Sequence, residues 1–151
     1  MAISAAEMSR RLKPLLNQEQ LLSLEEKEIK KNEKVLLQYK KYDFTIGDIT
    51  GDGITRVSYR SSEYEEYKFF KNPMAGGDVD LINDGDFIRS FFLQSPLQNQ
   101  TLFGASDSKA IGLIEKYGDE ILGINNDRFK IFLKKYVLDD FRKVLKKQLG
   151  Q

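Results

Sequence analysis

The chain has 151 residues, of which 40% are hydrophobic, and a formal net charge of +1. This length suits one hydrophobic core, and the near-neutral total gives no general indication of nucleic-acid binding. The sequence contains neither histidine nor cysteine, which excludes disulfides and most catalytic and metal chemistry. No apolar run approaches the length of a membrane span, and no secretory signal is evident, so we expect a cytoplasmic place of synthesis.

The first 44 residues are expected to form a helical extension. Residues 5–16 predict a short helix with apolar residues on one side, interrupted by Pro14. Residues 18–42 predict a longer helix for which Asn17 is a suitable N-cap. The middle of that helix is almost wholly polar, which is typical of a helix that projects from its domain or packs on a partner.

The region from residue 45 to residue 105 is predicted to be irregular β structure. Residues 55–59 alternate apolar and polar side chains, the period of a strand. Residues 87–93 (FIRSFFL) predict a strand, and residues 101–105 predict its returning partner. The polar stretch between them, residues 94–100, predicts a hairpin with a long loop.

Two helices are predicted to follow. Residues 109–117 form the first, capped by Asp107 or Ser108 and ended by Gly118. Residues 127–149 form the second, capped by Asn125 or Asn126. Its apolar residues follow the helical i, i+3, i+4, i+7 spacing and predict a core-facing stripe: Phe129, Phe132, Leu133, Tyr136, Val137, Phe141, Val144, Leu145 and Leu149.

These elements indicate an α+β fold. We expect a small antiparallel sheet packed against helices, with an N-terminal helical extension and a long amphipathic C-terminal helix. The expected division is an extension over residues 1–44 and an α+β domain over residues 45–151.

The string DITGDGIT at residues 48–55 resembles part of a calcium loop. Asp48, Thr50 and Asp52 occupy the first, third and fifth ligand positions of such a loop. The twelfth position, which needs a carboxylate, is Tyr59, and Arg56 places a cation at the ninth. The string therefore predicts a tight turn in which glycines adopt positive φ and the aspartates bond their own backbone.

Four aspartates gather between residues 78 and 86. They suggest either a magnesium ion or an acid–base pair, as in a metal-dependent hydrolase, or only loop solvation and capping. The residues are Asp78, Asp80, Asp84 and Asp86. Because the chain has no phosphate-binding glycine loop, dinucleotide fingerprint or nucleophile elbow, we expect no catalytic residue, no cofactor and no bound metal.

The C-terminal helix carries four lysines that could contact DNA phosphates. These are Lys134, Lys135, Lys146 and Lys147. A DNA-binding accessory protein is therefore one alternative. The interleaved aromatic residues lie on the core side of the helix, where they offer no stacking platform for bases.

Charge is unevenly distributed along the chain. Residues 43–86 contain ten acidic and four basic residues, whereas residues 128–149 contain eight basic and two acidic residues. Each run is either a solvated face or one half of a head-to-tail contact between copies. The residues we expect in such a subunit contact are Arg142, Lys143, Lys146 and Lys147 on one side and Asp78, Asp80, Asp84 and Asp86 on the other.

Three segments resemble a family of small neck, or tail-completion, proteins of tailed bacteriophages, in forms common among phages of Bacteroidetes. The first pattern, G-x-I-x-x-D-G-I with a following tyrosine, is matched by Gly47, Ile49, Asp52, Gly53, Ile54 and Tyr59. The second, a Tyr-Lys pair and then V-D-L-x-x-x-G-D-F-x-x-S-F, is matched by Tyr67, Lys68, Val79, Asp80, Leu81, Gly85, Asp86, Phe87, Ser90 and Phe91. The third, K-Y-G-D-x-I-x-G-L, is matched by Lys116, Tyr117, Gly118, Asp119, Ile121 and Gly123.

The resemblance covers about residues 45–149, and two positions depart from it. Ile124 stands where relatives often have leucine, and Asp84 stands where threonine is common. The resemblance implies an α+β fold without enzymatic activity, in a ring of copies beneath the portal. It implies as partners further copies of the chain, the portal and neighbouring neck or tail proteins, with packaged DNA nearby and no membrane.

The expected function is therefore that of a structural virion protein in the head–tail connector, assembled in the cytoplasm of the host bacterium. A minor tail protein or a capsid-decoration protein is the closest alternative.

Overall fold

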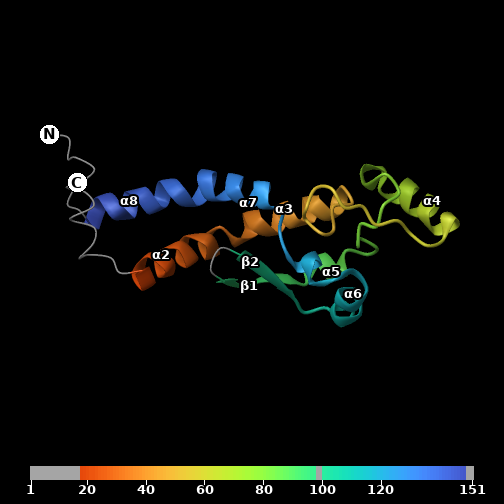
Figure 1. The fold of residues 1–151 in the computed structure, drawn as a ribbon, viewed down its shortest axis with the longest axis horizontal. Helices are drawn as coiled ribbons and strands as arrows, with labels where there is room; N and C mark the ends of the chain where they lie inside the picture. Colours follow the sequence, from red (N-terminus) through yellow and green to blue (C-terminus); the bar gives the residue numbers. More distant parts are fainter. Residues whose placement is uncertain (1–17, 98–99, 149–151) are drawn as a thin grey trace. The chain divides into compact units, whose positions relative to one another are not determined.

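The structure is a computed structural model that describes residues 18–97 and 100–148. The chain has the predicted α+β composition, with helices throughout and a two-stranded antiparallel sheet (Figure 1). Of the described residues, those up to Asn32 and from Phe132 onward form one compact unit, and Glu33–Ile131 form a second. Within the described ranges, no helix is both long enough and apolar enough to cross a membrane. The predicted helix at residues 5–16 and its neighbour Asn17 lie outside the described residues.

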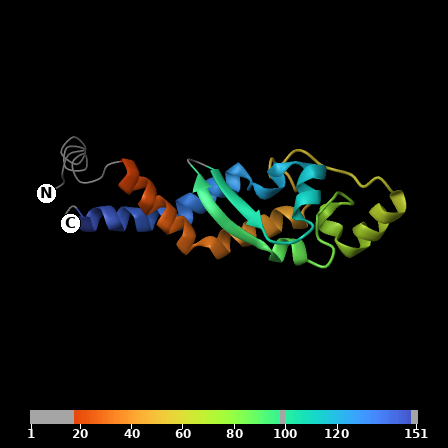
Figure 2. The same cartoon turned by 90° about the horizontal axis from the view of Figure 1, so that it is seen from below.

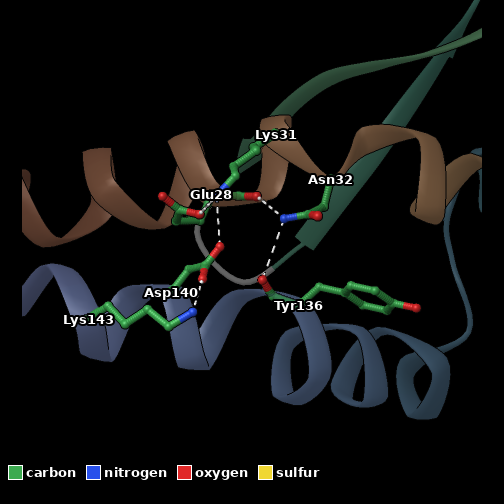
Figure 3. Close-up of polar contacts among 6 residues, drawn as sticks. All are labelled: Glu28, Lys31, Asn32, Tyr136, Asp140 and Lys143. Carbon is green, nitrogen blue, oxygen red and sulfur yellow. Dashed lines mark hydrogen bonds and ion pairs between the residues drawn. The ribbon is translucent and has the colours of Figure 1, made fainter.

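The first unit pairs α2 (Gln18–Lys31) with the C-terminal helix, which continues through the π-helical segment η3 (Leu133–Val137) into α8 (Leu138–Gln148). Polar contacts join the two helices (Figure 3). Lys31 forms an ion pair with Asp140 at 2.7 Å, and the Asn32 side chain donates to the Tyr136 carbonyl at 3.5 Å. Asp140 also accepts from Lys143 at 3.0 Å, so one carboxylate serves both helices.

One continuous helix was predicted over residues 18–42. The structure instead contains two helices, α2 and α3 (Glu33–Thr45), which are separated at Asn32. The Asn32 side-chain amide donates to the Glu28 carbonyl, the acceptor that its own backbone N–H would use in an α-helix. The backbone N–H of Asn32 donates to the Ile29 carbonyl instead, at 3.1 Å. Side-chain competition of this kind explains why the helical pattern is interrupted there.

The second unit begins with α3 and contains short helices around one hairpin. The sheet consists of β1 (Phe91–Leu97) and β2 (Gln100–Ala105), and β1 contacts α3 (Figure 2). The remaining elements are α4 (Ser62–Lys71), η1 (Pro73–Ala75), α5 (Asp86–Arg89), α6 (Ala110–Tyr117), η2 (Asp119–Leu122) and the first residues of α7 (Asn126–Phe132).

The predicted hairpin is confirmed, with different bounds. The pairing runs from Phe91 opposite Ala105 to Leu97 opposite Gln100, with an irregularity between Leu93 and Ser95. Strand β1 continues to Leu97 and β2 begins at Gln100, so both include residues that were predicted to be loop. Residues 98 and 99 lie outside the described residues. The first strand begins at Phe91 because Asp86–Arg89 is helical and follows Gly85, which has a φ of 83°.

The prediction of β structure over residues 45–105 is wrong between residues 62 and 71, which form α4. Ser61 caps this helix by accepting a hydrogen bond from the Tyr64 N–H, and acidic residues occupy its first turn. The alternating residues 55–59 form no strand. Among the described residues, their only β-type pairing is an isolated antiparallel bridge between Ser58 and Asp78.

Four phenylalanines form the centre of the second unit. The rings of Phe87 and Phe91 lie 5.0 Å apart, Phe44 lies 5.7 Å from Phe91, and Phe103 lies 6.0 Å from it. All four are buried, so α3, α5 and both strands share one aromatic cluster. Burying a phenylalanine is worth about 1.5–3 kcal/mol, which makes this cluster a main source of stability for the unit.

The predicted helix over residues 127–149 is confirmed as far as Gln148, where the described residues end. Asn125 caps it, since its side-chain oxygen accepts from the N–H groups of Asp127 and Arg128. Phe132 is fully buried and Val137 is buried, whereas Phe141 and its neighbours in the stripe are half-buried. The π-helical segment adds one residue to a turn of the helix. Residues beyond it are therefore rotated away from the face that α-helical spacing predicts to be buried.

The expected boundary at residue 44 coincides with no edge of the two units. Helix α3 contacts β1 and η1 and therefore belongs with the α+β unit. The C-terminal helix beyond Phe132 belongs with α2 instead. The N-terminal helix α2 therefore packs against the C-terminal helix, a pairing that local sequence does not indicate.

Candidate functional site

A cleft of about 690 Å³ opens in the second unit. Its walls come from three stretches of chain that are far apart in sequence, at residues 57–68, 79–87 and 109–117. Helix α4 contributes Tyr64 and Lys68, and α6 contributes Leu113 and Tyr117. The cleft combines apolar, aromatic and charged side chains in one concave surface and is the candidate binding site.

An ion pair between Lys68 and Asp80 lies in the wall of the cleft. The two charges are 2.8 Å apart, and their side chains are only 4% and 1% exposed. Asp80 also accepts from the Tyr59 hydroxyl, the Asn72 side chain and the Ile82 N–H. Both carboxylate oxygens are therefore satisfied, as a buried charge requires.

This arrangement is structural in character. Lys68 also donates to the Ile82 carbonyl, so the ion pair ties α4 to the backbone of residues 80–82. Burial, with the charge of Asp80 as a second cause, raises the pKa of Tyr59 above its usual range. The phenol therefore stays protonated and remains a donor to Asp80.

The structure does not bring the four predicted aspartates together. Asp80 pairs with Lys68, while the other three pair with different cations: Asp78 with Arg56 at 3.9 Å, Asp84 with Lys109 at 3.8 Å, and Asp86 with Arg89. In the part of the chain that the structure describes, no group of three acidic side chains is arranged to hold a metal ion. The predicted acidic cluster is therefore divided among four separate ion pairs.

The same contacts correct part of the expected subunit contact. Asp80 is buried in its ion pair with Lys68 and is not available to a neighbouring copy. On the C-terminal helix, Arg142 lies 3.5 Å from Asp139 and Lys143 lies 3.0 Å from Asp140. Most of the charges expected to meet between copies therefore have a partner within the chain, and Lys146 and Lys147 remain exposed.

The prediction of a turn at DITGDGIT is confirmed. Gly51 and Gly53 have φ values of 71° and 74°. Asp48 accepts from the Gly53 N–H at 3.1 Å, and Asp52 accepts from the N–H groups of Ile54 and Thr55. A hydrogen bond from the Thr55 hydroxyl, with these two backbone bonds, lowers the pKa of Asp52 to about 2.

A buried charged cluster was not predicted from the sequence. Lys40 and Asp43 on α3 are fully buried, as is Asp48 in the turn. Asp43 pairs with Arg128, whose guanidinium lies 4.7 Å from the centre of the Tyr42 ring. Lys40 donates to the Ile49 carbonyl at 3.4 Å and lies 4.5 Å from the centre of the Phe44 ring. The sequence signal was weak, because charged residues in a polar helix normally face solvent.

Burial lowers the pKa of Lys40 to about 7, against the opposing influence of Asp48. This is a suitable value for an acid–base group. However, Lys40 is fully buried and is not among the residues that line the cleft. We therefore assign the cluster to the core of the second unit.

Helix α4 carries an exposed aromatic surface. The side chain of Phe70 is 75% exposed, and those of Tyr67 and Phe69 are each 46% exposed. Met74, just beyond the helix, is also exposed. Exposed apolar side chains that are adjacent in this way mark interaction surfaces more often than catalytic ones.

Comparison of the chain with protein-family models, with curated proteins and with solved structures finds no match.

Proposed function

We propose that the chain is a structural protein of the head–tail connector of a tailed bacteriophage, in which copies form a ring between portal and tail. The proposal is carried by one observation, that the three segments resembling phage neck proteins build a single folded unit. Ile49 from the first segment, Val79 and Phe87 from the second and Ile121 from the third are all buried. The residues that carry the resemblance thus form a scaffold.

Contacts within and between these segments support the same reading. The ion pair between Lys68 and Asp80 joins the two halves of the second segment. Gly51 in the first segment lies against the backbone of Ile124 and Asn125 at the end of the third, where an added Cβ would lie 3.1 Å from the Asn125 nitrogen. Glycine is needed here for both its positive φ and this close approach.

A structural role also fits the chemistry of the acidic residues. The carboxylates expected of a metal-dependent hydrolase are held separately by four different cations. The exposed aromatic residues of α4 instead provide the kind of surface by which a connector protein would contact its neighbours.

The test is an amber mutation in the gene, followed by electron microscopy of lysates from a non-suppressing host. A connector protein predicts filled heads and complete tails that fail to join, restored by the wild-type gene supplied in trans. Heads without any complete tails would indicate a minor tail protein. Complete particles would indicate a decoration protein or a role outside the virion, and either result would contradict the proposal.

A further inference from the structure

Helix α4 presents an acidic and aromatic face away from the cleft. Tyr64 and Lys68 line the cleft, one turn apart. The helical spacing places Glu63, Glu66 and Phe70 on the opposite side. All three are exposed, and Phe70 lies against Phe69 with ring centres 6.2 Å apart. We call Glu63, Glu66 and Phe70 the outer face of α4.

The cleft has the complementary character. Its wall is apolar and aromatic where Leu81, Leu113 and Tyr117 line it, and the buried pair of Lys68 and Asp80 adds no net charge. Its rim carries three exposed cations, Arg60, Lys109 and Lys116, against one exposed carboxylate, Asp84. The cleft thus offers aromatic contacts beneath a basic rim, which suits a phenylalanine flanked by glutamates.

We propose that the cleft of one copy receives the outer face of α4 from a second copy. The cleft and the outer face lie on opposite sides of the same helix, so one copy can use both at once. A contact between two different surfaces is heterologous, and it builds a ring when the rotation from copy to copy closes. The inference rests on the proposed function, because it names the contact by which connector subunits join.

Cysteine cross-linking tests the contact directly, since the chain has no cysteine of its own. Glu66→Cys places a thiol on the outer face, next to Phe70. Asn83→Cys places one in the cleft, at an exposed lining residue. The two purified full-length proteins are mixed at high concentration and oxidised, and the disulfide-linked peptides are measured by mass spectrometry.

The expected result is about tenfold more of the 66–83 disulfide than a control pair yields, because docking raises the local concentration of the two thiols. The control combines Gln38→Cys, an exposed position on α3, with Asn83→Cys. Adding Phe70→Asp to the Glu66→Cys chain should reduce the 66–83 product to the control level. Because Phe70 is largely exposed, this variant should keep the wild-type circular dichroism spectrum.

Three results would overturn the contact: a 66–83 yield no greater than the control, an excess of the 66–66 disulfide, or a yield unaffected by Phe70→Asp. The 66–66 excess would indicate a symmetric dimer through α4. The outcome is separable from that of the proposed function. A protein that is present in particles without the 66–83 contact keeps the connector role, whereas a protein that forms the contact and is absent from particles loses it.

Discussion

At the scale of single residues, two buried lysines are accommodated in different ways. Lys68 has a carboxylate 2.8 Å away and carries its charge in an ion pair. Lys40 donates to the Ile49 carbonyl and lies over the Phe44 ring, and burial lowers its pKa to about 7. The first lysine therefore fixes two segments together, whereas the second makes the stability of the fold depend on pH.

We expect the free energy of unfolding to rise as the pH increases from about 7 to 9. The unfolded chain holds the lysine proton up to about pH 10.5, whereas the folded chain releases that of Lys40 near pH 7. Because the unfolded state binds more protons in this range, stability should increase by about 2 kcal/mol. Denaturant melts should show this increase in the wild type and in Lys41→Met, an exposed neighbour, but not in Lys40→Met. Equal pH slopes in wild type and Lys40→Met would disprove the assignment.

The ion pair of Lys68 and Asp80 should be costly to break. Asp80→Ala leaves a lysine buried without its partner, and we expect a loss of about 3–5 kcal/mol in the free energy of unfolding. Lys130→Ala, which removes an exposed i, i+3 pair with Asp127, should cost only about 0–1 kcal/mol. The double variant Lys68→Met with Asp80→Leu should lose less free energy of unfolding than the sum of the losses of Lys68→Met alone and Asp80→Leu alone. Full additivity in urea melts would show that the two side chains do not interact.

At the scale of elements, sequence pattern predicted those whose signals are local. The helix at α6, the cap at Asn125 and the C-terminal helix follow from residues within a few positions of one another. Helix α4 differs from the prediction because its YEEYKFF run lies between stretches with β-like patterns, although Ser61 and the following glutamates are a helix start. The break at Asn32 depends on one side chain returning to the backbone, which periodicity does not show.

The candidate site was predictable only in part. Lys68 and Asp80 both lie in the second of the three segments that resemble phage neck proteins. Their presence in one segment was the only indication in the sequence that they pair. The cleft itself is assembled from three stretches that are up to 60 residues apart, and only tertiary packing defines it. The buried charges of α3 were unpredictable for the same reason, since their burial is decided by Phe44, the 48–53 turn and Arg128.

The stripe of the C-terminal helix gives a prediction at this scale. Phe132 is fully buried and its ring lies 5.8 Å from that of Tyr136. Phe132→Ala should lower the free energy of unfolding by about 3–5 kcal/mol, because it leaves a cavity in a packed core. Phe141→Ala, at a half-buried site, should cost less, and Ile131→Ala, at a side chain 55% exposed, should stay within about 0.5 kcal/mol of wild type. A loss below about 1 kcal/mol for Phe132→Ala would mean that the buried face contributes little to folding.

At the scale of the whole molecule, the chain is organised as two units, and one of them joins the beginning of the described chain to its end. The three resembling segments lie in the other unit, which also contains the cleft and the exposed face of α4. We therefore expect the second unit to supply the contacts between copies. Helix α8 contains only the basic half of the contact expected from the sequence, and two of those residues, Arg142 and Lys143, form ion pairs within the helix.

Quantitative mass spectrometry of purified virions tests the central proposal most directly. The measurement is the ratio of this protein to the portal protein in particles that have been freed of unassembled material. A connector ring predicts a fixed ratio, with a copy number of the same order as that of the portal. Absence from the particles, or a copy number that follows the major capsid protein instead, would contradict the account.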